Sequence, residues 1–438
     1  AGLVVSGLLG ALVVLRSTGP GCARVDDDLA GVWDDARRDE VRAAFAATGV
    51  PFSAQALASV ERGLFVFAGA WTRQARARCE ANLSAASADV ASAADELGEL
   101  CLERRRVELR ALVDALARAD ATTVEHASAA VDRLRDPDLC ADPRALASEL
   151  ASAPLPADRT IAAAVFALRE RLAEVRFLEL AGRYDEGLAR AAPLVDDARR
   201  RGEPPALAEA LLQRAVLLGR KADYPEADEA LMAALAEAER AGYHALRAEA
   251  MVHRIELVGF HQAKPERVAE WIAPTRALVR HVAADGALEG RLLANIGLVR
   301  YRQGNFAAAV EAQEQALALL GRALKETDPE FVRALLDLGR SYHRSGRHHE
   351  ALQTLRRAHA TAIRALGPDH PLLIGIYLNL ANVGAGPGDL LYRRSIELSE
   401  RTFGPDHPSG ASAIANLGNT YNNYGHPEQA LALYVRAV

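Results

Sequence analysis

Residues 334–371 read ALLDLGRSYHRSGRHHEALQTLRRAHATAIRALGPDHP, and this stretch decides the fold. Leucine, alanine and glycine recur every three or four residues up to Gly346, and a second run with similar spacing continues to Gly367. A glycine after a helix adopts the left-handed conformation that closes the last turn, and a proline favours the start of the next helix. The stretch therefore predicts a hairpin of two antiparallel helices, ended by the joint Gly367-Pro-Asp-His-Pro371.

The same hairpin recurs along the chain. Its turn is marked by a glycine or another small or polar residue, and in most units an aromatic residue then leads into Glu-Ala or a related pair. Successive markers are 40, 40, 42, 42 and 79 residues apart, at Gly182, Ala222, Gln262, Gly304, Gly346 and Gly425. The last interval equals two units of 42 and 37, so we place a shortened repeat at the irregular stretch 384–389.

A second marker has the same register. It consists of three consecutive residues, one polar, one apolar and one small. Its four copies start at intervals of 42, 42 and 37 residues, at Asn295, Asp337, Asn379 and Asn416. The small residue lets the first helix of a hairpin approach the second closely, at Gly297, Gly339, Ala381 and Gly418. Two markers in one register predict a repeat array over 158–438, with about seven units of which the last is truncated.

The composition agrees with an all-α fold. Of 438 residues 50% are hydrophobic and only 5% aromatic, and alanine is the commonest residue. Alanine favours helices, whereas the β-branched and aromatic residues that favour strands are sparse. The net charge of −6 leaves no basic surplus to attract a phosphate backbone. We therefore expect an all-α chain, a helical cap segment followed by a superhelical array, with no nucleic-acid partner.

The repeats resemble tetratricopeptide repeats, and the 42-residue units with Gly-Pro-Asp-His-Pro joints resemble the kinesin-light-chain subtype. The resemblance covers residues 160–438 and is weakest at 246–283, where the turn lacks both the glycine and the aromatic residue. It implies a tetratricopeptide-repeat superhelical solenoid that binds a protein or peptide in a concave groove lined by the first helices. The chain itself is then a non-catalytic interaction module.

The later repeats supply the predicted groove residues. Leu417, Gly418 and Tyr421 match packing positions of the tetratricopeptide motif, which turns other positions of that helix towards the groove. Asparagine carries donors and acceptors that can hold the backbone of an extended peptide, and arginine can bind a carboxylate. Alternatively, the asparagines at the second marker only stabilise the turns between helices. The predicted groove residues are Asn295, Asp337, Arg340, His343, Arg344, Asn379, Asn416, Asn419, Asn422 and Asn423.

The chain begins with an unbroken apolar run from Ala1 to Leu15, which stops at Arg16. A bilayer span needs about 20 such residues, so we interpret residues 1–16 as a truncated transmembrane helix that links the protein to a membrane. A secretory signal peptide is the first alternative, although no positive segment precedes the run. A buried amphipathic helix is the second.

Between these parts, residues 17–157 form the predicted helical cap segment. Helices are expected from Asp34 to about 47, from Ser53 onward, and at about 96–119 and 121–134. In the helix that begins at Ser53, large apolar residues recur three or four apart, which predicts a buried face. These predicted core residues are Leu57, Val60, Leu64, Phe67 and Trp71.

All four cysteines lie in this first third, at Cys22, Cys79, Cys101 and Cys140. They lack the Cys-x-x-Cys spacing of metal sites, and no histidine stands at a ligand-like offset, so no metal is expected. In an oxidising compartment two disulfides would form, with three possible connectivities. A hairpin of the flanking helices would pair Cys79 with Cys101 and leave Cys22 for Cys140. Four reduced, buried cysteines are the alternative.

A second resemblance concerns the whole arrangement. A truncated membrane span, a four-cysteine helical segment and such repeats together resemble the extracytoplasmic C-terminal region of eukaryotic-type serine/threonine kinases of myxobacteria. Leu29-Ala-Gly-Val-Trp33 and Cys101-Leu-Glu-Arg-Arg105 carry this resemblance. It implies the sensor or docking region of a membrane-anchored kinase whose catalytic domain lies outside this chain. A soluble scaffold, or the repeat domain of a cytosolic signalling or transcriptional regulator, is the alternative.

No catalytic motif is present in the sequence. Neither a phosphate-binding glycine loop nor the catalytic motifs of a kinase occur. His348-His349-Glu350 is similar to a fragment of a zinc-protease motif, but no histidine follows His349 four residues later. The fragment falls in a repeat turn, so we expect no catalytic residue and no cofactor.

Overall fold

The computed structural model describes residues 22, 28–50, 53–85, 93–142, 159–180, 182–282, 286–405 and 407–437. Within these residues the chain is helical and contains no strand, in agreement with the predicted all-α fold. No helix in the described residues is long and apolar enough to cross a membrane. The predicted span at 1–16 lies outside them, and so does the predicted boundary between cap and array near residue 157.

The chain divides into two compact units. Unit 1 comprises Ala1–Phe177, Pro193–Ala210 and Glu237–His244, and unit 2 comprises Leu178–Ala192, Leu211–Ala236 and Ala245–Val438. The division does not follow the repeat boundaries, because all four helices of the first two hairpins contribute residues to both units.

Unit 1 contains the cap helices, and aspartate side chains cap the starts of two of them. Asp34 accepts a hydrogen bond from the Arg37 backbone NH at 2.9 Å, and Asp120 accepts one from the Thr123 NH at 2.8 Å. A 3₁₀ turn follows at the predicted break around Pro137. The bounds are α2 Asp35–Ala47, α3 Ser53–Ala85, α4 Ala93–Leu116, α5 Ala121–Asp132 and η2 Pro137–Ala141.

One face of α3 forms the centre of the cap core, as its spacing predicts. Val60 and Leu64 are fully buried, Phe67 and Trp71 nearly so, and Leu57 packs partly buried against them. The indole NH of Trp71 donates a hydrogen bond to the backbone oxygen of Leu102 at 2.8 Å, which satisfies its only donor across to α4.

The cysteines form two disulfides, Cys22–Cys79 and Cys101–Cys140, so the expected pairing of Cys79 with Cys101 was wrong. That prediction considered only the position of each cysteine along a helical hairpin. The direction in which each side chain points decides which cysteines form a disulfide. Cys101 is 3% exposed and points into the core, where η2 supplies the fully buried Cys140.

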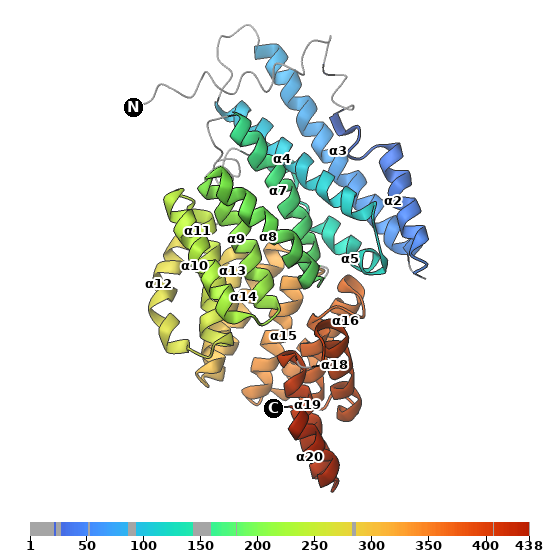
Figure 1. Cartoon of the computed structure of the whole chain (residues 1–438), viewed down its shortest axis with the longest axis vertical. Coiled ribbons are helices and arrows are strands. Elements are labelled where there is room, and N and C mark those ends of the chain that lie inside the picture. Colours follow the sequence, from blue (N-terminus) through green and yellow to red (C-terminus); the bar gives the residue numbers. More distant parts are fainter. Residues whose placement is uncertain are drawn as a thin grey trace. The chain divides into compact units, whose positions relative to one another are not determined.

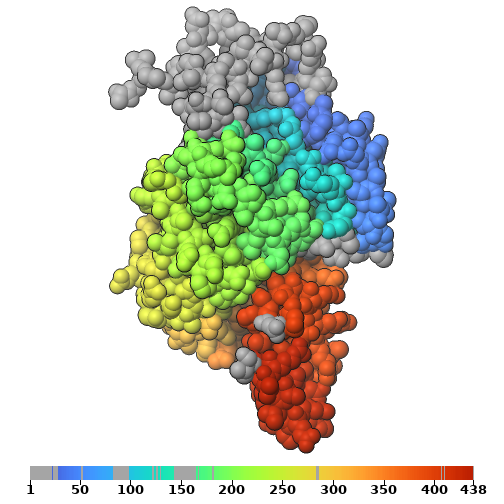
Figure 2. Space-filling model, viewed as in Figure 1, coloured from blue at the N-terminus to red at the C-terminus, as the bar shows by residue number. Residues whose placement is uncertain are grey.

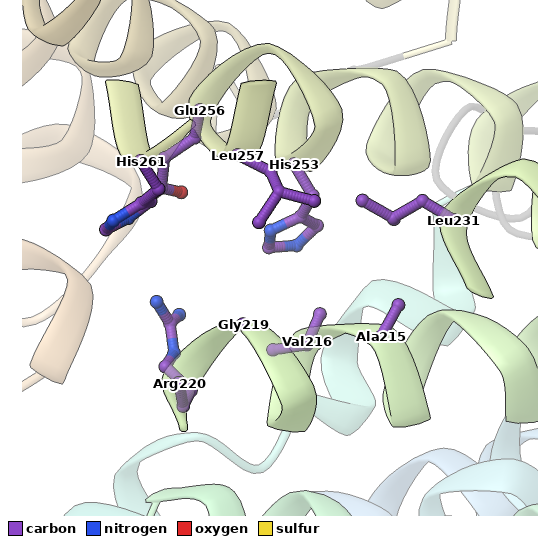
Figure 3. A pocket seen from close by; sticks show the side chains of 9 residues that line it. All are labelled: Ala215, Val216, Gly219, Arg220, Leu231, His253, Glu256, Leu257 and His261. Carbon is purple, nitrogen blue, oxygen red and sulfur yellow. The ribbon is translucent and has the colours of Figure 1, made fainter. Parts of the chain in front are cut away.

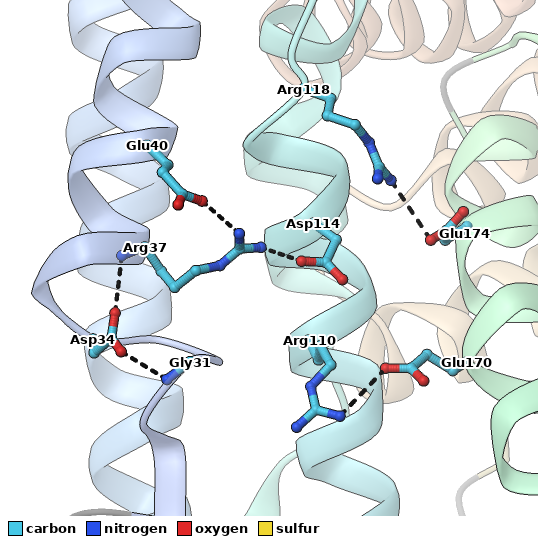
Figure 4. Close-up of polar contacts among 9 residues, drawn as sticks. All are labelled: Gly31, Asp34, Arg37, Glu40, Arg110, Asp114, Arg118, Glu170 and Glu174. Atoms are coloured by element: carbon cyan, nitrogen blue, oxygen red, sulfur yellow. Dashed lines mark hydrogen bonds and ion pairs between the residues drawn. The ribbon is translucent and has the colours of Figure 1, made fainter.

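Ion pairs at the surface of unit 1 join α2, α4 and α7, which spans Arg159–Leu180 (Figure 4). Arg37 of α2 pairs with Asp114 of α4. The next link runs from α4 to α7, where Arg110 lies 3.8 Å from Glu170 and Arg118 lies 3.6 Å from Glu174. Partly exposed pairs of this kind contribute at most about 1 kcal/mol each, so they orient the helices more than they stabilise them.

From Arg159 onward the described residues form consecutive helical hairpins, in which neighbouring helices run antiparallel (Figure 1). In the space-filling view the last hairpins, orange to red, make one continuous surface (Figure 2). The hairpins are α7 with α8 Tyr184–Arg201, α9 Pro204–Arg220 with α10 Tyr224–Arg240, α11 His244–Glu256 with α12 Pro265–Val282, α13 Ala287–Arg302 with α14 Phe306–Ala323, α15 Pro329–Arg344 with α16 His348–Leu366, α17 Leu372–Asn382 with α18 Gly388–Phe403, and α19 Pro408–Asn423 with α20 Pro427–Arg436.

Close approach of the two helices explains the small residue of the second marker. A Cβ atom on Gly339 would lie 2.6 Å from Cγ of Leu355, and one on Gly297 would lie 2.5 Å from Cγ of Gln313. At Gly418 the nearest atom, of Tyr434, would be 2.8 Å away. No larger side chain fits unless its neighbour moves, so the predicted role of these glycines is confirmed.

The turns show where the predicted register was imperfect. Gly304 and Gly346 are left-handed with φ of 75° and 82°, as predicted for a C-cap. In the third hairpin the left-handed residue is Ala263, with φ of 53°, and not Gln262. In the sixth hairpin it is Gly384, because α17 has 11 residues where α15 has 16 and so ends at Asn382. The turn at Gly384 thus comes 38 residues after Gly346, four residues short of the 42-residue period. Four residues are about one helical turn, so the shortened helix α17 still directs the same face towards its neighbours.

Candidate functional site

The first helices of unit 2 share one polar face, which we call the inner face. Arg220 at the end of α9, Glu256 on α11 and Arg333 on α15 interact electrostatically, although whole hairpins separate them in sequence. Such helices can do so only if the array curves around a common space. In the 42-residue register the inner face comprises Glu249, His253 and Glu256 of α11, Phe260 of the π-helix that follows α11, Arg291, Asn295, Leu298 and Arg302 of α13, and Arg333, Asp337, Arg340 and Arg344 of α15.

A change of helix type positions the acidic centre of this face. Residues Leu257–His261 form a π-helix, and the NH of Gln262 donates to the oxygen of Leu257, five residues earlier, at 2.9 Å. In a π-helix the backbone hydrogen bonds join residues five apart, so side chains with this spacing lie closer to one face than they do in an α-helix. His261 is therefore brought beside Glu256, with 3.5 Å between Nε2 and Oε1.

Opposing effects set the charge of Glu256. Burial by itself raises its pKa, but the hydrogen bond and charge of His261, together with Arg220 and Arg333, outweigh burial and hold the pKa well below its usual range. Glu256 is therefore ionised at neutral pH. Figure 3 shows Glu256 and His261 on one side of a small cavity of about 30 Å³, with Arg220 on the other side.

His253 lines the same cavity, one helical turn before Glu256 (Figure 3). Burial lowers the pKa of its imidazole, and the nearby carboxylates of Glu249 and Glu256 offset this only in part. Its neutral form is therefore favoured in the folded protein. In the described part of the chain no group of three or more His, Cys, Asp or Glu side chains is arranged to hold a metal ion.

Beyond this centre, arginine side chains lie over aromatic rings of neighbouring repeats. The guanidinium carbon of Arg340 lies 4.8 Å from the ring centres of both Phe260 and Tyr301. Arg302 lies 4.7 Å from the Phe260 ring, and Arg344 lies 5.0 Å from the ring of Phe306. We call Phe260, Tyr301, Phe306, Arg302, Arg340 and Arg344 the arginine–aromatic ladder. Its rings are half-buried, and Arg302 and Arg344 are exposed.

The predicted asparagines of the second marker make hydrogen bonds within the chain. The buried amide of Asn295 donates to the backbone oxygen of Val252 at 2.9 Å, across to the preceding hairpin. Asn379 donates to the oxygen of Gly375 in its own helix at 2.8 Å, and Asn416 donates to Oδ1 of Asn382 at 3.0 Å. These bonds agree with the structural alternative, and a direct hold on a peptide stays a prediction.

The other predicted residues differ in accessibility. Asp337 is buried and pairs with Arg340 at 2.9 Å, so the carboxylate of this chain already occupies one edge of that guanidinium. His343 is half-buried beside His348, and burial together with the charge of His348 lowers its pKa. Asn419 accepts a hydrogen bond from the Tyr434 hydroxyl at 2.8 Å. Asn422 and Asn423 are exposed at the end of α19.

The sequence analysis did not predict Arg220, Glu256, His261 or Arg333 as site residues. A signal existed for two of them, because Glu256 stands two periods before Arg340 and Arg333 stands one period after Arg291. This periodic signal was hard to recognise because α11 and its irregular turn belong to the repeat with the weakest marker. The π-helix adds a further change of phase that a regular period cannot reveal.

Contacts within unit 2 connect its first hairpin turn, near Tyr184, to the joint after α18, near His407. The ring of Tyr184 stacks on Phe403 with centres 6.0 Å apart, and Phe403 stacks on His407 at 4.2 Å. Nε2 of His407 lies 3.0 Å from the backbone oxygen of Lys221, 186 residues away in the chain. The inner face is therefore bounded by a contact between the first and sixth hairpins.

Comparison with protein families identifies the later repeats. Family models described as tetratricopeptide repeat match residues 291–330, 330–389 and 391–438. These residues are tetratricopeptide repeats, a fold that generally binds protein partners and is non-catalytic. A search of curated proteins finds no match.

Solved structures of several repeat proteins are similar. A putative kinesin light chain of Podosopora anserina with nearly identical repeats shares 18% identity over 44% of this chain and 92% of its own, with a TM-score of 0.36. BtubC (BKLC) from P. vanneervenii shares 18% over 58% and 89%, with a TM-score of 0.32. A Rap protein complexed with competence and sporulation factor shares 13% over 87% and 96%, with a TM-score of 0.47.

Proposed function

We propose that the inner face of unit 2 binds an extended peptide segment of a partner protein without catalysing a reaction. The arginine–aromatic ladder carries this proposal. Arginine and tyrosine are enriched among the residues that contribute most to protein interfaces. Here three arginines, Tyr301 and two phenylalanines form a row of half-buried and exposed side chains. Its three arginines and Tyr301 lie on the successive first helices α13 and α15, and Phe260 lies on the π-helix that extends α11, while Phe306 begins α14. The row therefore crosses successive repeats, which matches the direction of an extended ligand.

The stacking of the ladder lowers the cost of binding. A long arginine side chain that is free in solution loses rotamer entropy when it contacts a ligand. Arg340 is already held by two rings and by Asp337, so most of that loss has occurred before a ligand arrives. A guanidinium stacked by its face still has NH groups at its edge, and these can donate to the backbone oxygens of a peptide.

Retention of peptides tests the proposal. A pool of random heptapeptides with amidated ends should be retained by the immobilised chain and much less by the double variant Arg302→Ser, Arg344→Ser. Both side chains are exposed, so we expect the substitutions to leave the fold intact. The double variant Arg322→Ser, Arg356→Ser on the second helices α14 and α16 is the matched control. Equal retention by all three proteins would overturn the proposal.

We further propose that the chain is the sensor or docking region of a membrane-anchored serine/threonine kinase, on the outer side of the membrane. Support comes from the kinase resemblance at Leu29–Trp33 and from two disulfides, which persist in oxidising compartments. A soluble scaffold or cytosolic regulator stays the alternative. Alkylation of thiols in intact cells of the source organism distinguishes them, because four alkylated cysteines in unit 1 would support the cytosolic alternative.

A further inference from the structure

One side of the long cap helix α3 exposes a pair of large apolar side chains. Phe65 is 76% exposed and the adjacent Val66 is 69% exposed, whereas Leu64 and Phe67 on the opposite side belong to the cap core. Single exposed apolar residues are common on protein surfaces, but an adjacent pair of this size forms a patch of the kind found at contact sites.

The neighbouring cap helices approach α3 on its other sides. A side chain of α2 forms an ion pair with Glu61 at 2.7 Å, and α4 accepts the hydrogen bond of the Trp71 indole. At Gly63 an added Cβ atom would lie 2.5 Å from a side chain of α5. With 3.6 residues per turn, Phe65 and Val66 lie between the positions of Glu61 and Gly63 around the helix, so none of these three helices covers the pair.

Exposed arginines follow the same side of α3, about one turn before the apolar pair and two and three turns after it. We define the outer stripe of α3 as Arg62, Phe65, Val66, Arg73 and Arg76. Asp138 of η2 lies 3.2 Å from Arg73, and Glu80 stands about one turn beyond Arg76. Three basic groups thus face two acidic ones, so the outer stripe is positive in a chain whose net charge is −6.

A disulfide limits the distance between α3 and the apolar run at the start of the chain. Cys22 is bonded to Cys79, which stands one turn beyond Arg76 on α3. The run stops at Arg16, and the six residues from there to Cys22 span about 20 Å when fully extended. Cys79 is therefore held within about 20 Å of the segment interpreted as a membrane span. Phe65 stands 14 residues before Cys79, about 21 Å along the helix axis.

We propose that the outer stripe of α3 lies on the surface of an anionic phospholipid bilayer, with Phe65 and Val66 inserted between the lipid headgroups. This inference rests on the proposed membrane anchorage of the chain. Basic side chains attract anionic headgroups, and apolar side chains buried at the interface add affinity. The apolar run Ala1 to Leu15 carries no acidic residue, so it complements the arginines less well than lipid phosphates do.

The disulfide explains how so small a patch can act. Two apolar residues and three arginines on a free protein would bind a bilayer only weakly. A short tether converts this contact into an intramolecular one, because it keeps the outer stripe at a high effective concentration next to the membrane. The stripe would then hold the cap in one orientation on the bilayer.

Fluorescence quenching by brominated lipids tests this contact on the full chain. The vesicles contain equimolar phosphatidylcholine and phosphatidylglycerol, and the phosphatidylcholine carries bromine in its acyl chains. Phe65→Trp places a fluorophore in the outer stripe, and we expect most of its added emission to be lost on these vesicles. Tyr424→Trp, at a residue that is 75% exposed in the turn of the last hairpin, is the matched control and should lose much less.

A charge variant tests the role of the arginines. Arg62→Gln, added to Phe65→Trp, should lower the ratio of quenched to unquenched emission about fivefold, the effect of one basic residue at an anionic surface. Vesicles of phosphatidylcholine alone should show no such difference. Arg356→Gln, at an exposed arginine of α16, should leave the quenching unchanged on both kinds of vesicle.

Flotation of the same samples separates the two proposals. If the wild-type chain does not float with the vesicles, the proposed membrane anchorage fails and this inference fails with it. If the chain floats but Phe65→Trp is quenched no more than Tyr424→Trp, only the inference is overturned. In that case, loss of self-association in Phe65→Ser would assign the outer stripe to a second copy of the chain.

Discussion

Two turns of the array hold an alanine in the left-handed conformation that glycine provides in the others. Ala222 has φ of 64° and Ala263 has φ of 53°, whereas Gly304 and Gly346 fill the same place in later hairpins. A left-handed residue with a Cβ atom costs roughly 1–2 kcal/mol, because the Cβ approaches the following carbonyl oxygen. The hairpin after α11 therefore carries local strain next to the π-helix that positions Glu256.

Ala263→Gly should stabilise the folded protein by about 1 kcal/mol, because glycine adopts this conformation without the Cβ contact. The midpoint of urea unfolding, followed by circular dichroism, measures the change. Ala277→Gly, at an exposed position inside α12, is the matched control and should lose about 1 kcal/mol, since glycine weakens a helix interior. A loss of stability in both variants would show that Ala263 is not strained.

His253 should make the stability of unit 2 depend on pH. Burial lowers its pKa in the folded state below the value of about 6.5 expected in the unfolded chain. The unfolded state then binds more protons, so the stabilisation is present above pH ~6.5 and is lost as the pH falls through the lowered pKa. We expect His253→Gln to lose less stability than the wild type between pH 7 and pH 5 in urea unfolding. An identical difference for the exposed His281→Gln would contradict this assignment.

At the scale of elements, the disulfides join Cys22 to α3 and the turn η2 to α4. Cys101–Cys140 closes a loop with a sequence separation of 39 and holds the short turn η2 against α4. The loss of such a link should destabilise the cap by about 4 kcal/mol on the chain-entropy estimate. We expect the double variant Cys101→Ala, Cys140→Ala to unfold at lower temperature, with the helicity of α2 to α5 lost first.

The connectivity has its own test. Proteolysis without reduction, followed by mass spectrometry, should give one linked pair of peptides with Cys22 and Cys79 and another with Cys101 and Cys140. A linked peptide with both Cys79 and Cys101 would restore the hairpin pairing. The same digest after reduction serves as its control.

Features of the fold that follow the repeat period could be predicted from the sequence. Features that depend on the direction of a side chain or on a contact between distant residues could not. The hairpins, the Gly339 contact and the buried face of α3 follow from spacing alone, because packing geometry repeats with the helix. The disulfide partner of Cys101 depends on the direction of a side chain. The site residues Glu256 and His261 depend on a π-helix, which arises where the sequence leaves the period.

For the array as a whole, contacts between distant repeats distinguish this protein from a simple stack. Each hairpin of an open solenoid contacts only its neighbours, so its ends fray independently. Here the ring of Phe403 joins Tyr184 to His407, and His407 reaches the backbone of Lys221. Gly182 permits this approach, since a Cβ atom on it would lie 2.6 Å from Cδ of Pro371. The first turn of unit 2 is thus stabilised by joints near the other end of the chain.

Phe403→Ala with His407→Ala should therefore loosen a turn more than 200 residues away. An aromatic pair and a hydrogen bond each contribute about 1 kcal/mol, so backbone amides of residues 182–187 should exchange hydrogen at least about tenfold faster. Exchange in α13 and α14, which do not touch this contact, should stay unchanged. His426→Ala is the control: this histidine lies in the turn of the last hairpin, and its ring centre is 6.2 Å from that of Tyr421 in the same hairpin. If that variant accelerates exchange at 182–187 equally, the effect is general loosening of the array and the closing contact is not its cause.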